Sequence, residues 1–106
     1  MLLNKVHFAA LITYSTEKGS RPVSVAIGDL NSDQVLDIVV ANFGSNNVGI
    51  FEGYGNGTLK DQKTHSVGYG GHPNKVTFGN FTNGDWMDIA VVSYDTDTVL
   101  LLSKIC

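Results

Sequence analysis

Side chains that carry oxygen recur at alternate positions in one short stretch of the chain, residues 28–40. They occupy positions 1, 3, 5 and 9 of a loop that is followed at once by an apolar run, and they are Asp29, Asn31, Asp33 and Asp37. Calcium takes six to eight oxygen ligands, so a loop that supplies one on alternate residues can wrap a single ion. The spacing therefore predicts a calcium loop.

The same loop offers a further ligand from its backbone. In the EF-hand loop the seventh position contributes a carbonyl oxygen, which here would belong to Val35. Three carboxylates within nine residues repel one another unless a cation or open water screens them. The alternative is a solvated acidic turn, which is common for Asp, Asn and Ser clusters between strands.

Other catalytic or metal chemistry has little support in the sequence. The chain has no Gly-x-Ser-x-Gly elbow, P-loop or zinc-protease motif. Its histidines, His7, His65 and His72, are far apart, and none has a Cys or His at zinc-like spacing. Carboxylates that converge on one point suit an ion better than glycoside hydrolysis, which needs two carboxyls about 5 Å or more apart across a substrate. We expect no enzymatic activity.

Composition and charge limit the class of protein. The chain has 106 residues, room for one ordinary domain, and its 42% apolar and 16% charged residues allow a packed core. Its net charge is −3 and its seven basic residues are scattered, so we expect no nucleic-acid partner. The mildly apolar start of the chain is interrupted by Lys5 and His7, and no apolar run reaches signal-peptide or membrane length. A single cysteine, Cys106, cannot form an internal disulfide.

An internal repeat dominates the rest of the chain. Two sets of eight residues match at a constant separation of 51 residues without a gap: Gly19, Pro22, Val25, Gly28, Asp37, Ile38, Val40 and Val48 recur as Gly70, Pro73, Val76, Gly79, Asp88, Ile89, Val91 and Val99. The match extends backwards, since residues 8–16 correspond to residues 59–67. Repeats of this length are typical of propellers and related arrays.

Within one repeat the pattern predicts four short strands and no helix. Residues 23–27 alternate with period 2, residues 38–41 are apolar on both faces, and residues 48–51 form a third apolar run. The tetrapeptide at 54–57 contains Asn-Gly, a strong hairpin signal, and residues 59–67 are mixed, as expected of an outer edge strand. No segment shows a sustained 3.6-residue apolar period.

Four antiparallel strands in about 50 residues match the blade of a β-propeller. A β-sandwich has similar strand spacing but does not require two copies of one unit, so the repeat favours blades. We expect an all-β fold of two four-stranded antiparallel propeller blades, as part of a propeller or as a unit that forms oligomers. Residues 1–18 are the outer strand of a preceding or swapped blade, residues 19–69 the first repeat, and residues 70–106 a second repeat that stops before its outer strand.

The motifs resemble a known family. Gly-Asp-x-Asn-x-Asp-x-x-x-Asp-Ile-Val-Val at residues 28–40, followed by Tyr-Gly-Asn-Gly-Thr at 54–58, resembles the FG-GAP and VCBS-type repeats, which form the blades of integrin-α-like β-propellers. Gly-Gly-His-Pro at residues 70–73 is similar to the Gly-Gly-Ala-Pro part of the FG-GAP signature. The resemblance covers about residues 8 to 103.

This resemblance implies that the acidic loop binds calcium and that the module is an extracellular platform for adhesion or ligand binding. The implied ligands are Asp29, Asn31, Asp33, the carbonyl of Val35, and Asp37. One departure concerns the sixth loop position, where the family usually has glycine and this chain has Gln34. A positive φ would strain a non-glycine residue there, so we expect weak calcium binding.

The second loop departs further from the family pattern. Its equivalent positions are Asn80, Thr82, Gly84 and Asp88, which leave one carboxylate, while Asp85 is displaced by one residue. Asn80, Thr82 and Asp88 are therefore only a weak second metal site. Asn56 and Asn80 each begin an N-glycosylation sequon, although such short motifs often arise by chance. Glycosylation of Asn80 and ion binding there would exclude each other.

Two functions remain open from the sequence. The first is a non-catalytic calcium-binding module at an extracellular or cell-surface location, with a protein or glycan ligand. The second is a purely structural fragment of a larger propeller, in one version appended to a polysaccharide-acting enzyme. The neighbouring blades would belong to the same longer chain or to other copies in a homo-oligomeric ring, in which three or four chains give six or eight blades.

Overall fold

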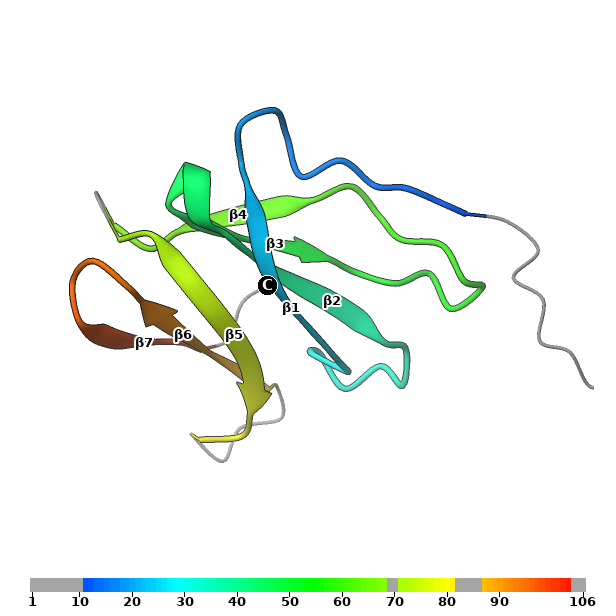
Figure 1. Ribbon diagram of the computed structural model, residues 1–106. Coiled ribbons are helices and arrows are strands. Elements are labelled where there is room, and N and C mark those ends of the chain that lie inside the picture. Colours follow the sequence, from blue (N-terminus) through cyan, green and yellow to red (C-terminus); the bar gives the residue numbers. More distant parts are fainter. Residues whose placement is uncertain (1–10, 69–70, 82–86, 104–106) are drawn as a thin grey trace, which may run out of the picture.

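The computed structural model describes residues 11–68, 71–81 and 87–103. These residues form two antiparallel sheets and no α-helix (Figure 1). The first sheet has the order β1-β2-β3-β4 and the second the order β5-β6-β7. In the first, β1 spans Pro22–Gly28, β2 Asp37–Asn42, β3 Asn47–Phe51 and β4 Lys63–Ser66. In the second, β5 spans Pro73–Gly79, β6 Asp88–Ser93 and β7 Thr98–Leu102. The predicted all-β fold of antiparallel blade-like units is confirmed, and the described residues of the second unit form three strands.

The repeat predicted from the sequence holds at the level of single residues. β5, β6 and β7 begin and end 51 residues after β1, β2 and β3. The register irregularity between Pro22 and Ser24 recurs between Pro73 and Lys75. The turn residues Asn46 and Asp97 both have a left-handed backbone, with φ of 56° and 53°. The two units therefore share their backbone geometry as well as their sequence pattern.

The outer strand of the first sheet is shorter than predicted. β4 covers residues 63–66, and the expected strand start at Leu59 forms only an isolated bridge with Gly53. Between them the chain reverses as the Asn-Gly signal predicts, and the Tyr54 N–H donates to the Thr58 carbonyl at 3.0 Å. Gly55 and Gly57 carry the positive φ values of this turn.

Alternation along the strands gives each sheet two faces, which we name A and B. Face A of the first sheet carries Val23, Val25, Ile27, Ile38, Val40 and Phe51, and its face B carries Ala26, Val39, Ala41, Val48 and Ile50. In the second sheet face A carries Val76, Phe78, Ile89, Val91, Leu100 and Leu102, and face B carries Thr77, Ala90, Val92, Val99 and Leu101.

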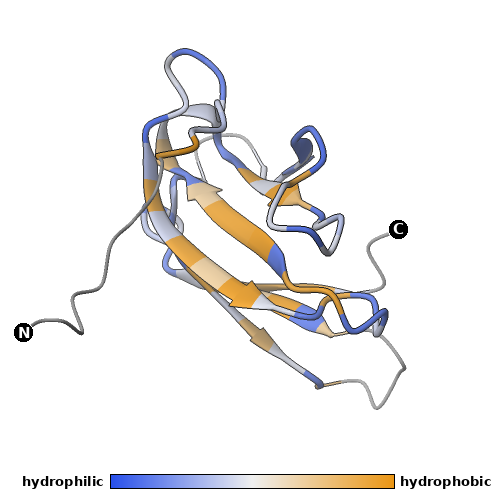
Figure 2. Cartoon of the chain, turned by 90° about the vertical axis from the view of Figure 1, so that its right-hand side faces the viewer, coloured by the Kyte–Doolittle hydropathy of each residue, from blue (hydrophilic) through white to orange (hydrophobic). Residues whose placement is uncertain are grey.

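The core lies between face B of the first sheet and face A of the second. Val39, Val48, Ile89 and Val91 are fully buried there, with Leu30 from the first loop beside them. Small side chains on β1 let β5 approach closely, and a Cβ on Gly28 would lie 2.9 Å from the Phe78 ring. Figure 2 shows hydrophobic residues along the strands and hydrophilic ones in the loops at their ends. The acidic loop lies at one end of this core, between β1 and β2 (Figure 1).

Candidate metal centre

The first loop, residues 29–36, is wound around its own carboxylates. The Asp29 carboxylate accepts hydrogen bonds from the N–H groups of Asp33 at 3.1 Å and Gln34 at 2.7 Å. The Asp33 carboxylate accepts one from the Val35 N–H at 2.9 Å. Gln34 has a φ of 66° and Ser32 a φ of 60°, so the chain turns sharply there without glycine. The left-handed backbone expected at Gln34 is confirmed, and it carries a strain cost.

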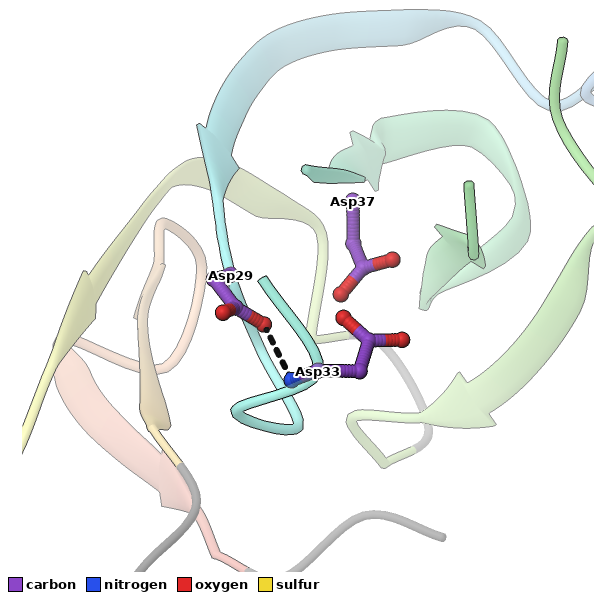
Figure 3. Close-up of side chains that lie close together, drawn as sticks. All are labelled: Asp29, Asp33 and Asp37. Carbon is purple, nitrogen blue, oxygen red and sulfur yellow. Dashed lines mark hydrogen bonds between the residues drawn. The ribbon is translucent and has the colours of Figure 1, made fainter. Parts of the chain in front are cut away.

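Three carboxylates converge within this loop. Asp29, Asp33 and Asp37 each place one carboxylate oxygen so that all three lie within 4.8 Å of one another (Figure 3). Calcium holds oxygens at about 2.3–2.6 Å, so two of its ligands are at most about 5 Å apart. The three oxygens therefore fit around one calcium ion, and calcium bound among them would supply the positive charge that offsets their repulsion.

Asn31 adds a polar group whose orientation depends on the charge nearby. With its amide nitrogen turned towards Asp33, Asn31 donates hydrogen bonds of 3.0 and 2.8 Å to the two carboxylate oxygens. In the opposite orientation the amide oxygen faces these oxygens, an arrangement that a cation among them would favour. Asn31 thus lies beside the Asp33 carboxylate, while its role as a ligand and that of the Val35 carbonyl stay predictions.

Asp37 differs from the other two carboxylates because it is fully buried. One of its oxygens accepts a hydrogen bond from the Leu30 N–H at 3.0 Å, and the other accepts one from the Gly53 N–H at 2.9 Å. Burial raises the pKa of Asp37 above its ordinary value of 3.8; the two backbone hydrogen bonds oppose this rise, and the charges of Asp33 and Glu52 add to it. Asp37 therefore both faces the candidate site and fixes the loop to the sheet.

The raised pKa determines how Asp37 affects stability. Since the folded state holds this proton more tightly than the unfolded chain, the contribution of Asp37 is fully present below about pH 3.8 and is lost as the pH rises through the folded pKa. Without calcium, NMR titration of the Asp37 carboxyl carbon should give a pKa above 3.8, and millimolar calcium should lower it by competing with the proton. A pKa at or below 3.8 in chelator would contradict this account of the site.

The second loop retains the structural part of this arrangement. Asp88 is buried and accepts a hydrogen bond from the Phe81 N–H at 2.7 Å, as Asp37 does from the Leu30 N–H 51 residues earlier. Asn80 is exposed, and Thr82 lies outside the described residues. The Asp88 carboxylate therefore has the anchoring role of Asp37, and the weak second metal site stays a prediction.

Leu30 is a site residue that the sequence analysis did not single out. Its side chain is buried in the core, its N–H binds Asp37, and its carbonyl accepts a hydrogen bond from the Met87 N–H at 2.9 Å. Leu30 thus connects the acidic loop to both sheets. The sequence feature that could have identified Leu30 is an apolar residue at the second position of both loops, Leu30 in the first and Phe81 in the second.

The remaining candidates lie apart from the loop. The side-chain oxygen of Asn56 accepts hydrogen bonds from the N–H and the hydroxyl of Thr58, and Asn56 is exposed, as a glycosylated residue must be. His72 stacks on Phe43 with ring centroids 4.7 Å apart and contacts the Asp95 carboxylate. His65 lies on β4, and His7 lies outside the described residues.

The arrangement of the two sheets and the loop defines a class of protein. Antiparallel units of one repeat that stack face to face are typical of propeller-type repeat proteins. A family model, the FG-GAP-like repeat, matches residues 29–91, so the chain belongs to the FG-GAP-like repeat family. Neither the curated proteins nor the solved structures contain a significant match to it. The described part of the chain contains no helix that is long and apolar enough to span a membrane.

Proposed function

We propose that this chain is a non-catalytic module of propeller type, stiffened by one calcium ion in the first loop, that presents a binding surface for a protein or glycan outside the cell or at its surface. The convergence of Asp29, Asp33 and Asp37 within 4.8 Å carries this proposal. Membership of the FG-GAP-like repeat family supports the extracellular setting and the binding role.

Calcium acts on the fold because the loop connects the two sheets. Leu30 is hydrogen-bonded to Asp37 on one side and to Met87 on the other, so an ion that holds Asp29, Asp33 and Asp37 together also orders this connection. Binding to the folded state alone stabilises a protein in proportion to the logarithm of one plus the ratio of free ligand concentration to the dissociation constant. The strained Gln34 in place of glycine favours an affinity typical of extracellular calcium modules, about 10⁻⁴ to 10⁻³ M.

Thermal unfolding in calcium and in chelator tests the proposed site. Millimolar calcium is expected to stabilise the chain by roughly 1 kcal/mol, which raises the melting temperature by about 5 °C. Asp33→Ala should abolish the difference, because Asp33 is exposed and supplies one of the three oxygens. Asp61→Ala, which removes an exposed aspartate outside the loop, should keep it. Identical melting curves for the parent chain would exclude the calcium site.

The second candidate function is a purely structural unit of a larger propeller. The apolar residues that remain exposed on face A of the first sheet and on face B of the second favour it, because such faces pack against further blades. This function requires no calcium. A parent chain that is indifferent to calcium would therefore support the structural unit against the calcium-stiffened module.

A further inference from the structure

Apolar residues remain exposed on two faces, at opposite sides of the pair of sheets. On face A of the first sheet, Val25 and Ile27 are 59% and 62% exposed. On face B of the second sheet, Val99 and Leu101 are 72% and 49% exposed. An apolar groove of about 410 Å³ runs over the first of these faces and one of about 200 Å³ over the second. Exposed apolar surface of this extent indicates an interaction site.

The repeat determines what each of these faces fits. Face B of the first sheet already packs against face A of the second to form the core. In the repeat, face B of the second sheet corresponds to face B of the first sheet, which is buried in the core. Face A of the first sheet likewise corresponds to face A of the second sheet, which is its partner in the core. The interface inside the chain is therefore a template for a contact between the two exposed faces of different copies.

Side-chain sizes within the chain agree with such a contact. Inside the chain, Phe78 on face A packs over Gly28, and Leu30 fills the adjacent core. At the equivalent positions Ile27 replaces the phenylalanine and Phe81 replaces the leucine, and both are about 60% exposed. The pair inside the chain and the pair between copies each combine one phenylalanine with one leucine or isoleucine, with the phenylalanine on opposite sides of the contact. The summed side-chain volume is therefore the same in both contacts, as close packing requires.

The corner between the sheets repeats in the same way. Inside the chain, the His72 ring packs on Phe43, and the backbone N–H of His72 donates a hydrogen bond to the Asn46 side-chain oxygen at 2.9 Å. The equivalents of His72, Phe43 and Asn46 are Arg21, Tyr94 and Asp97. Tyr94 is 63% exposed, and a guanidinium over its ring or beside the Asp97 carboxylate would make a favourable contact.

The backbone just before β1 repeats contacts that are found just before β5. The Gly71 N–H donates a hydrogen bond to the Gly68 carbonyl at 3.2 Å, and the equivalent bond from the Ser20 N–H to the Glu17 carbonyl is also 3.2 Å. Glu17 has a φ of 83° although it is not glycine, and its equivalent Gly68 has a φ of 99°. At these described residues the approach to β1 therefore matches the approach to β5, which follows the outer strand β4.

We propose that face B of the second sheet binds face A of the first sheet of a second copy of this chain, and that residues 12–15 of that copy extend the second sheet beside β7. The pairing of β3 with β4, Asn47 with Ser66 and Ile50 with Lys63, places Ser15 opposite Thr98 and Ile12 opposite Leu101. Added in this way, residues 12–15 cover the edge of β7 that has no partner strand in the described chain.

The N-terminal segment must move for this contact to form. Residues 11–16 form no strand in the single chain, and Tyr14 lies over face A of its own first sheet, with its ring 6.1 Å from Phe51 and its hydroxyl accepting a hydrogen bond from the Leu59 N–H. Release of this segment uncovers face A and provides the added strand. Because the contact is heterologous, copies add head to tail until a ring closes, with about three or four copies for six or eight blades.

Light scattering and native mass spectrometry of the chain over a wide range of concentration test the proposal. The parent chain is expected to form one discrete closed oligomer with or without calcium. A chain that stays monomeric would overturn the proposal and leave its faces to blades of another sequence. A polydisperse aggregate would overturn it as well, because a closed ring has one size.

Two single substitutions distinguish this heterologous contact from any symmetric one. Val25→Asp alters only face A and Val99→Asp only face B, and both residues are exposed in the single chain, so both variants should fold. Each variant alone is expected to be monomeric, whereas their mixture should form a one-to-one dimer through the one intact pair of faces. A variant that still self-associates, or a mixture that stays monomeric, would contradict the proposal.

Strand addition has its own test. Proline removes a ladder hydrogen bond where its N–H would face the neighbouring strand, and N–H groups of successive residues face opposite sides, so the double variant Thr13→Pro/Tyr14→Pro is expected to dissociate the oligomer while Thr13→Ala leaves it intact. For the two charge-introducing variants Val25→Asp and Val99→Asp, the control is Asp61→Lys, which changes the charge of an exposed residue in the loop before β4 and should leave the oligomer intact. An oligomer that survives the Thr13→Pro/Tyr14→Pro double variant would exclude pairing of residues 12–15 with β7.

Discussion

Asp37→Ala is expected to lower the free energy of unfolding by about 3 kcal/mol. Asp37 is fully buried and accepts hydrogen bonds from the N–H groups of Leu30 and Gly53, one on each oxygen. Alanine would leave both donors without this acceptor, and hydrogen bonds to a charged group each contribute about 1.5–3 kcal/mol. The raised pKa of Asp37 indicates that burying its charge costs free energy. Alanine removes this cost, which offsets only part of the lost hydrogen-bond energy.

Urea unfolding in chelator measures this effect without any contribution from calcium. Asp33→Ala is the matched control, because Asp33 is exposed and its carboxylate accepts hydrogen bonds only from groups of the loop itself among those described, the Val35 N–H and the Asn31 amide. We expect that control to change the free energy of unfolding by less than about 1 kcal/mol. Equal losses for the two variants would show that Asp37 does not anchor the loop.

Gly53→Ala is expected to destabilise the chain by about 2 kcal/mol. A Cβ at this position would lie 2.3 Å from the Leu36 carbonyl oxygen and 2.8 Å from a methyl group of Val35. The backbone must shift to relieve this overlap, and the shift would separate the Gly53 N–H from Asp37. The variant should therefore also weaken the response to calcium, since Asp37 would no longer be held in place.

Gly49→Ala provides the comparison for this substitution. The three atoms nearest to its Cβ would all belong to the Gln62 side chain, which can move aside at the cost of the hydrogen bond that its Oε1 accepts from the Asn42 side chain. Unfolding midpoints in urea should therefore fall more for Gly53→Ala, where the obstacle is backbone, than for Gly49→Ala. A larger loss at Gly49 than at Gly53 would mean that close approach of the backbone at Leu36 is not what requires glycine.

Much of the fold could be predicted from the sequence because the two copies of the repeat can be aligned with each other. The separation of 51 residues located every strand of the second sheet once the first was assigned, and the alternation in residues 23–27 correctly predicted β1. The convergence of the three loop carboxylates also followed from their spacing, since side chains on alternate residues of a turning loop point towards a common centre.

Other features depend on packing, which spacing does not reveal. The alternation in β1 gives one apolar face, but the structure packs the small residues Ser24, Ala26 and Gly28 towards the second sheet and leaves Val25 and Ile27 exposed. The two roles of Asp37 were also hidden, because its second partner, Gly53, is 16 residues away and is brought near by the β2–β3 pairing. Leu59 was placed in a strand that forms only from Lys63 onwards.

Residue-resolved NMR during a calcium titration tests the central claim most directly. We predict saturable shifts of the amide resonances of residues 29–37 and of Gly53, whose N–H binds Asp37, with no comparable change at Asn80 or Asp88. Asp33→Ala should remove these shifts while the rest of the spectrum stays folded. Absence of a saturable response in residues 29–37 at millimolar calcium would contradict the assignment of this loop as a calcium site.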